Sequence, residues 1–319
     1  MSTTITANET TVDEALASES SGPTTGALVL AFAAIYLIWG STYLAIRFAI
    51  ETIPPLLMLG TRFGIAGLAM TLWARSRGAV PATRQQWRWA WLLGVLMPCW
   101  GTGSVAWAEQ TISSGLAALL VAILPLLVVV IETFVLRERR LSPGMLVGVV
   151  VGFAGIAYLV RPGFAVPDTG AARLGVGVLI TGITAWGVGS VYSRRAALPA
   201  SKILAIGMQM LTGGVSLVAI GLLLGEGARF HPAELSAVSV VAWLYLVVFG
   251  TFCAFSAYLW LLQVTAPTRV ATYAYVNPLV ALFLGWALAG EDLNAQILIT
   301  ATIVLGSVAL ILKSKSSVK

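Results

Sequence analysis

The chain has 319 residues, of which 58% are hydrophobic and only 10% are charged. Soluble domains usually carry roughly a quarter charged residues, so this composition excludes the ordinary soluble, disordered and fibrous classes of protein. With two cysteines and one histidine, the sequence offers no disulfide framework and no metal-ligand cluster, and we expect neither a metal nor a cofactor.

The chain begins with a polar, acidic segment and continues as a series of apolar runs. Residues 1–26 contain no Lys or Arg, which predicts a disordered cytosolic tail and not a secretory signal. Ten apolar runs follow, each near the ~20 residues that a membrane-spanning helix needs. They cover 27–46, 55–73, 89–107, 115–136, 143–160, 174–193, 203–224, 237–263, 268–289 and 294–312. The sequence therefore predicts an all-α integral membrane protein with ten transmembrane helices, ending in a basic tail at 313–319.

The charge distribution predicts the orientation of these spans. With the N-terminus in the cytosol, the inside connections hold 14 of the 19 Lys and Arg residues, the outside connections hold 4, and Arg62 lies within a span. Cytosolic connections of membrane proteins are enriched in basic residues. We therefore expect both termini in the cytosol and a location in the inner membrane, surrounded by lipid. The orientation of the spans in the membrane accounts for the excess of basic residues, so no nucleic-acid partner is expected.

The two halves of the chain resemble each other. The segment 107–125 aligns without gaps on 260–278, which pairs Pro125 with Pro278, and at the same offset Glu138 falls on Glu291. Earlier, WGSTYLAIR (39–47) aligns on WGVGSVYSR (186–194), and the next spans match at the same offset. We infer one repeat over 27–161 and a second over 174–312.

Five spans in each repeat would make the second copy enter the bilayer upside down relative to the first. Inverted repeats are the architecture of alternating-access transporters, whose substrate site lies near the middle of the membrane between the halves. The alternative is that duplication supplied only a stable helix bundle.

These motifs resemble those of the drug/metabolite transporter superfamily. The similarity lies in YLIWGSTYLAIR (36–47), LGTRFGIAG (59–67), the unit from Pro to Glu that ends each repeat, and above all ATYAYVNPLVALFLGWALAGEDL (271–293). Within the superfamily the chain is similar to the EamA (RhaT-like) family and its YedA-like inner-membrane permeases, over about residues 27–312. The resemblance implies two EamA domains and a ten-helix exporter of small metabolites or drugs, without fixing the solute.

Aromatic and polar side chains recur on one face of several predicted spans. Trp39 and Tyr43 share a face of the first span, and Trp100, Ser104 and Trp107 share a face of the third. In lipid such groups are kept mainly where they meet a partner or a cavity, although packing and headgroup anchoring are alternatives. The candidates for substrate binding are Trp39, Tyr43, Trp100, Trp107, Trp186, Gln209, Trp260, Tyr273 and Asn277.

Three prolines lie within predicted spans: Pro98, Pro125 and Pro278. Each removes one backbone donor and frees a carbonyl four residues earlier, so we expect kinks that serve either as bending points for gating or as packing features. The Asn277 amide, directly before Pro278, could satisfy a freed carbonyl or bind a solute.

Few charges lie within the spans. Arg62 must face the bundle interior or snorkel; it either binds an anionic solute or braces helix ends, and the matching residue of the second repeat is Gln209. Glu132 lies well inside an apolar helix, so with Arg62 it is a candidate for coupling, although pairing with Arg137 would explain it without transport. Glu109, close to the predicted outer rim, ranks second as a proton carrier.

The leading functional prediction is a secondary active exporter of small organic metabolites, such as amino acids or amphipathic drugs, driven by proton exchange. A passive facilitator or exchanger is the alternative, favoured by the shortage of carboxylates within the spans. An intramembrane enzyme would need a nucleophile–base pair or metal ligands in the spans, which the sequence lacks, so no enzymatic activity is expected. A membrane scaffold is disfavoured by the paired prolines. The sequence does not decide between a monomer and a homodimer, although packing within one chain is the default interpretation of its glycine motifs and a homodimer is the minority one.

Overall fold

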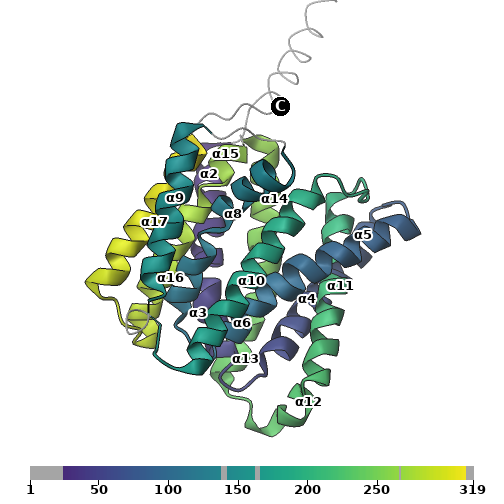
Figure 1. Ribbon diagram of the computed structural model, residues 1–319. Helices are drawn as coiled ribbons and strands as arrows, with labels where there is room; N and C mark the ends of the chain where they lie inside the picture. The colour runs from purple at the N-terminus through teal and green to yellow at the C-terminus, as the bar shows by residue number, and fades with distance from the viewer. Residues whose placement is uncertain (1–23, 138–141, 162–165, 266, 314–319) are drawn as a thin grey trace, which may run out of the picture.

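The computed structural model describes residues 24–137, 142–161, 166–265 and 267–313, and these form an all-helical bundle (Figure 1). The first repeat contains α2 (Thr25–Ala33), η1 (Ala34–Ile38), α3 (Trp39–Ala49), α4 (Pro55–Ser76), α5 (Arg84–Gly94), η2 (Val95–Thr102), α6 (Gly103–Ala108), α7 (Ser114–Val121), α8 (Leu124–Val130), η3 (Ile131–Val135) and α9 (Pro143–Leu159). The second contains α10 (Gly170–Ser193), α11 (Lys202–Leu223), α12 (Glu226–Arg229), η4 (Pro232–Glu234), α13 (Ala237–Tyr245), η5 (Leu246–Cys253), α14 (Ala254–Val264), α15 (Pro267–Val270), α16 (Tyr273–Ala289) and α17 (Ala295–Lys313).

Many of these elements join end to end into longer helices. Within the described residues, six helical stretches are long and apolar enough to cross a membrane: 25–49, 55–76, 114–135, 170–193, 202–223 and 237–261. The shorter helices α9, α16 and α17 are also apolar. The stretch α5–η2–α6 is continuous as well, but Arg84 and Arg88 make its first turns polar. The predicted tail at 1–26, Glu138, and the end of the basic tail from residue 314 fall wholly or mostly outside the described residues.

Glycines place α4 against α11, the most extensively packed pair of helices. A Cβ atom on Gly67 would lie 2.7 Å from the Gly207 carbonyl oxygen, and one on Gly60 would lie 3.1 Å from the Gly214 carbonyl oxygen. At the offset of 147 residues between the repeats, Gly60 corresponds to Gly207 and Gly67 corresponds to Gly214. Exchanging the two repeats therefore converts the contact of Gly67 with Gly207 into the contact of Gly214 with Gly60, as a twofold relation between the repeats requires.

A second pair of contacts obeys the same relation. Gly40 of α3 packs against Val280 and the Asn277 carbonyl of α16, and its mate Gly187 of α10 packs against Leu124 and Leu127 of α8. The partners Leu124 and Leu127 are the residues that the sequence alignment matches to Asn277 and Val280. The repeated sequence thus produces repeated packing.

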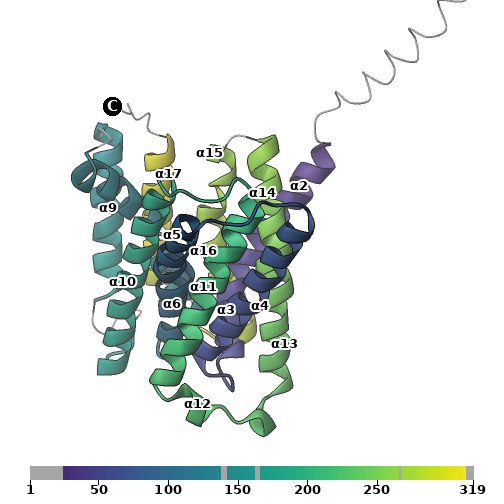
Figure 2. The same ribbon diagram turned by 90° about the vertical axis from the view of Figure 1, so that its right-hand side faces the viewer.

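We call the two ends of the bundle the α12 side and the terminus side. Figure 2 shows α12 at the bottom of the molecule, whereas α2 begins and α17 ends at the top. The connections 50–54, 109–113 and 290–294 lie on the α12 side, where polar contacts join them to neighbouring helices. The helix α10 begins on the α12 side, because Gly175 in its second turn contacts Ala108 and Thr111. The first helix of each repeat therefore begins at opposite ends of the bundle.

The core is unequal at the two ends. One large cluster of buried residues fills the α12 side and extends to the middle of the bundle, joining the ends of α3, α6 and α9 to the starts of α4, α7, α10 and α17. On the terminus side, the buried side chains of the described residues fall into three separate clusters. These unite α2 with α14 and α15, α8 with α9 and α17, and α4 with α5 and α11. The buried core is thus continuous at one end of the bundle and falls into separate clusters at the other.

Two π-helical segments occupy equivalent places in the repeats. Each of η2 and η5 contains eight residues and lies in the middle of the helical stretch that ends with α6 or α14. A π-helical segment leaves the regular hydrogen-bond pattern and is frequent at functional sites. Pro98 lies inside η2, which accounts for the irregularity of that segment.

Two more glycines mark equivalent turns. Gly78, after α4, and Gly225, after α11, both have left-handed backbone angles, with φ of 84° and 81°. The residue after each glycine differs between the repeats: Ala79 follows Gly78, whereas Glu226 follows Gly225. Ala79 packs beside Ile203 at the start of α11, and Glu226 lies at the start of α4.

Candidate functional site

Four aromatic side chains form a cluster where α3 meets α14 and α16. The Trp39 ring lies 5.1 Å from the ring of Tyr273, 5.3 Å from that of Tyr258 and 6.2 Å from that of Phe255, measured between centroids. Trp39 also donates from Nε1 to the carbonyl oxygen of Gly250 in η5, at 3.2 Å. Tilted and edge-on ring contacts of this kind stabilise a cluster beyond simple burial. The predicted residues Trp39 and Tyr273 are thus in contact.

Asn277 connects this cluster to the first helix. It is 8% exposed. In the amide orientation that hydrogen bonding favours, its Nδ2 donates to the carbonyl oxygens of Tyr36, at 3.3 Å, and Tyr273, at 3.1 Å. Of the two roles expected for Asn277, the structure places the amide on backbone carbonyls, although the carbonyl freed by Pro278 is not among them.

Arg62 lies beside the same region, buried between α4 and η5. Its side chain is 6% exposed, its Nε donates to Thr251 Oγ1 at 3.1 Å, and its guanidinium lies over the Phe63 ring at 5.0 Å. Thr251 in turn donates to the Leu246 carbonyl, so Arg62 is tied to the π-helical segment. Within the described part of the chain, the guanidinium has no carboxylate partner and its terminal nitrogens make no hydrogen bond. Four N–H groups of the guanidinium therefore have no hydrogen-bond partner among the described residues.

The remaining predicted residues lie in other parts of the bundle. Trp260, like Trp39 and Tyr273, is partly buried and packs against the small core cluster of Ala31, Ile35, Leu261 and Val270. Trp186 covers Gly101 of η2, and Trp100, which is 45% exposed, donates to Thr181 Oγ1 at 3.2 Å.

Tyr43 packs on the α12-side core. Gln209 donates to the Ala205 carbonyl of its own helix, at 3.1 Å. The structure therefore brings together Trp39, Tyr273 and Asn277, with Trp260 on the same small core cluster, but does not join them to Trp100, Trp107 or Trp186.

The three prolines differ in their effects. Pro98 lies within η2, and Pro125 is the second residue of α8, after a break in the helix at Ala122–Ile123. Pro278 remains inside the continuous helix α16. The second repeat also has a break in its helix, between α15 and α16, but this break lies before Pro278 and not next to it.

A groove of about 500 Å³ opens on the side of the bundle, between the first helix, α13 and α16. Its lining is apolar apart from Ser41 and Tyr245, whose hydroxyl groups lie 2.6 Å apart. None of the predicted substrate residues lines this groove.

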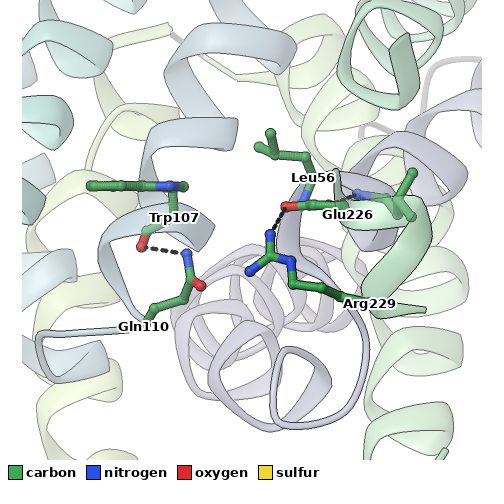
Figure 3. Close-up of polar contacts among 6 residues, drawn as sticks. Leu56, Trp107, Gln110, Glu226 and Arg229 are labelled. Carbon is green, nitrogen blue, oxygen red and sulfur yellow. Dashed lines mark hydrogen bonds and ion pairs between the residues drawn. The ribbon is translucent and has the colours of Figure 1, made fainter. Parts of the chain in front are cut away.

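On the α12 side, a buried carboxylate closes the start of α4. Glu226 is 1% exposed and accepts from the backbone N–H of Leu56, at 3.0 and 3.2 Å, and of Leu57, at 2.9 Å. Figure 3 shows Glu226 between the Leu56 backbone and Arg229, whose guanidinium is 3.7 Å away. Pro54 before α4 has no side-chain cap of its own, so Glu226 supplies it from the other repeat. Figure 3 also draws Trp107, near the end of α6, whose carbonyl oxygen accepts from Gln110 at 3.0 Å.

A second carboxylate joins the repeats in the same way. Glu291, between α16 and α17, accepts from the backbone N–H of Ser114 at 2.7 Å and of Gly115 at 3.0 Å, at the start of α7. Negative charge is favourable at a helix N-terminus, so both carboxylates strengthen closure of the α12 side.

On the terminus side, Glu132 of η3 is 8% exposed and forms an ion pair with Arg194, after α10. The sequence suggested Arg137 as its partner, and the structure instead joins it to the second repeat. Sequence reasoning also missed Tyr258, Phe255 and Glu226 as members of these sites. Only Glu291 carried a signal, because it aligns with Glu138 in the repeat.

The EamA-like transporter family matches the chain twice, over residues 25–161 and 173–313. The chain belongs to this family. The chain is 37% identical over 264 residues to "Uncharacterized inner membrane transporter YedA" of Escherichia coli (strain K12), covering 82% of each protein. It is 24% identical to "Uncharacterized transporter YoaV" of Bacillus subtilis (strain 168), covering 87% of this chain and 94% of the relative. A solved crystal structure shares the fold, with a TM-score of 0.59 at 23% identity, over 90% of this chain and 96% of its own.

These comparisons confirm the EamA family and the similarity to YedA-like permeases that the sequence motifs indicated. EamA membership, together with the apolar helices, identifies the chain as a membrane transporter. The names of these two relatives describe transporters and not enzymes.

Proposed function

We propose that this EamA protein exports small organic metabolites, such as amino acids or amphipathic drugs, by alternating access in exchange for protons. The α12 side would face the outside of the inner membrane, and both termini would lie in the cytosol. The charge count along the sequence supports this orientation. Ten membrane crossings, arranged as two inverted repeats of five, complete the proposal.

The unequal packing of two similar repeats carries the proposal. Contacts at Gly60, Gly67, Gly207 and Gly214 exchange between the repeats, yet one end of the bundle has a continuous core and the other has three separate clusters. If the repeats exchange their conformations, the α12 side divides and the terminus side closes. Two conformations of nearly equal packing, open to opposite sides, are what alternating access requires.

The solute would bind where the divided half meets the closed core. Trp39, Tyr273 and Tyr258 supply aromatic surface there, and Asn277 fixes the position of two of their helices. Arg62 would hold a carboxylate or another anionic group with its free N–H groups. A solute with both an aromatic or aliphatic body and a negative group fits this arrangement, as amino acids do.

Glu132 is the proposed residue for exchange of the driving proton. Its carboxylate lies on the divided side and links the repeats through Arg194, so protonation of Glu132 would release that link. Loss of one partner of a partly buried ion pair shifts the balance between two conformations.

Gradient-driven flux in proteoliposomes tests the proposal. Vesicles loaded with a panel of amino acids, sugars and cationic drugs are given a pH gradient, and flux through the wild type is compared with flux through Glu132→Gln. Asp168→Asn, an exposed carboxylate on the α12 side, is the matched control. We expect the gradient to drive flux in the wild type and the control but not in Glu132→Gln. Equal flux in all three would remove Glu132, and no flux of any solute would refute the exporter.

Cysteine labelling in intact cells tests the orientation. Ala233→Cys, exposed on the α12 side, should react with a membrane-impermeant maleimide added outside. Ala200→Cys, exposed on the terminus side, should react only after the cells are permeabilised. Reaction of both from the outside would contradict the proposed topology.

A further inference from the structure

Glu109 is a buried carboxyl group that the proposed transport mechanism does not use. It follows α6 on the α12 side and is fully buried. Neither carboxyl oxygen has a hydrogen-bond partner in the structure, and no salt bridge reaches it from the described residues. Burial of an ionised, unpartnered carboxylate is far more costly than burial of the neutral acid.

The nearest cation does not neutralise this carboxyl group. Arg47 of α3 donates from Nη1 to the backbone carbonyl oxygen of Glu109, at 2.8 Å, and its charge acts to lower the pKa of the Glu109 carboxyl group, but burial, the largest cause, raises that pKa well above its usual value. The carboxylate of Glu291 also acts on Glu109 and opposes its ionisation, because both would be negative. Geometry therefore favours a neutral Glu109 while the α12 side is closed.

The other neighbours supply no compensating charge. Tyr43 of α3 is the third titratable group close enough to interact electrostatically with Glu109. α10 contributes Gly175, and its Arg173 is exposed and directed toward Asp168. α7 presents Ser114, whose hydroxyl is buried without a partner. Arg62 of α4 is bonded to η5 instead.

We propose that Glu109 is a proton-binding site: its carboxylate takes up one proton from water on the α12 side as that side closes, and returns it as that side opens. The step forms an O–H bond and changes the charge of Glu109 from −1 to 0. The inference rests on the proposed alternation between two conformations, and it assigns to Glu109 the sensing of pH on one side. A proton bound and returned on the same side sets the rate of conformational change without crossing the membrane.

The consequence is a pH-dependent closure with a defined sign. Because the closed form binds one more proton than the open form, the ratio of closed to open molecules falls by up to about tenfold for each unit of rising pH. Acidic water on the α12 side therefore holds that side closed. Replacing Glu109 by a neutral residue should abolish the dependence and leave the closed form favoured at every pH.

Thiol labelling of a buried reporter measures this equilibrium. Ala117→Cys, in the first turn of α7, is introduced after Cys99→Ala and Cys253→Ala, since Ala117 is fully buried in the closed form. Its reaction with an impermeant maleimide is followed from about pH 5 to about pH 8 on the α12 side, a range in which exposed carboxylates are already ionised. We expect labelling to rise steeply with pH, and Glu109→Gln to label slowly throughout.

Two controls make the measurement specific. The maleimide reaction itself speeds up with pH, so each rate is divided by that of Ala233→Cys, which is exposed on the same side. Glu51→Gln removes an exposed carboxylate at the end of α3 and should leave the pH dependence unchanged.

Three outcomes overturn the inference. They are the absence of pH dependence in the wild type, an unaltered pH dependence in Glu109→Gln, and failure of both Glu109→Gln and Glu109→Met to fold. The third counts because a neutral Glu109 carboxyl group without hydrogen-bond partners should not be needed for folding. Solute flux is measured on the same proteins. Absence of flux in the wild type refutes the proposed function, whereas normal flux with an unaltered pH response refutes the role of Glu109 alone.

Discussion

The close contact of α4 and α11 at Gly67 leads to a quantitative prediction for Gly67→Ala. A Cβ atom at this position would lie 2.2 Å from the backbone nitrogen of Leu211, whereas ordinary contact begins near 3.4 Å, so the helices must separate by about 1.2 Å. The obstructing atoms belong to the backbone, which cannot rotate away. Overpacking of this kind costs about 1–3 kcal/mol.

Gly64→Ala is the matched control. Gly64 lies one turn away on the same helix, and a Cβ atom there would meet no atom within 4 Å. Both replacements gain the same preference of Ala over Gly for the helix, about 1 kcal/mol, so the difference between them isolates the clash. The repeat mate of Gly67 is Gly214, where a Cβ atom would lie 2.4 Å from the Gly64 nitrogen, and Gly214→Ala should therefore behave like Gly67→Ala.

Thermal unfolding of the detergent-purified proteins, followed by the loss of the monodisperse peak in size-exclusion chromatography, measures the difference. We expect Gly64→Ala to match or exceed the wild type, and Gly67→Ala to melt at least about 2 °C lower than Gly64→Ala. Equal melting of Gly67→Ala and Gly64→Ala would refute the packing argument. A large loss in Gly67→Ala without one in Gly214→Ala would refute the equivalence of the repeats.

Three further predictions concern polar contacts between the repeats. Glu291→Gln weakens two hydrogen bonds to a charged acceptor at the start of α7, so labelling of the buried Ala117→Cys reporter should rise several-fold over that in the Glu291 protein. Asn277→Ala removes two hydrogen bonds to backbone carbonyls and should lower unfolding stability by about 1–3 kcal/mol, measured as a lower midpoint in chemical denaturation. Arg62→Gln keeps a donor for Thr251 but removes the positive charge, so competition assays should show weakened binding of anionic solutes and unchanged binding of neutral ones.

The apolar spans and the repeat could be predicted because they depend on local composition and on alignment within one chain. Hydrophobic runs near the length of a membrane crossing located the helices, and the spacing between Gly60 and Gly67 recurred at Gly207 and Gly214. The glycine matches proved to be contacts between the repeats, which explains why the same residue type stands at both places.

The direction in which each side chain of the third predicted span points around the helix axis could not be predicted. The expected face of Trp100, Ser104 and Trp107 assumed a regular helix, but η2 is π-helical and rotates the residues that follow it relative to those before. Trp100 is accordingly 45% exposed while Ser104 is 4% exposed. No pattern of residue types around Pro98 distinguishes this segment from an ordinary kink.

Ion pairs between residues far apart in the sequence could not be predicted either. Glu132 lies close in sequence to Arg137, but its partner Arg194 belongs to the other repeat, and only the packed bundle brings them together. The Glu109 carboxyl group lacks a hydrogen-bond partner because Arg47 bonds to the Glu109 backbone carbonyl instead, which is a matter of side-chain geometry.

The carboxylate at the start of α4 has no counterpart in the first repeat, where Ala79 stands beside the start of α11. A conformation in which the two repeats had exchanged their structures would therefore lack this carboxylate, and its hydrogen bonds to a helix start, at the closed end. Hydrogen bonds to a charged group contribute about 1.5–3 kcal/mol each, and 1.4 kcal/mol already corresponds to a tenfold population ratio. In the proposed alternation, the difference between Ala79 and Glu226 would therefore favour the conformation in which the α12 side is closed.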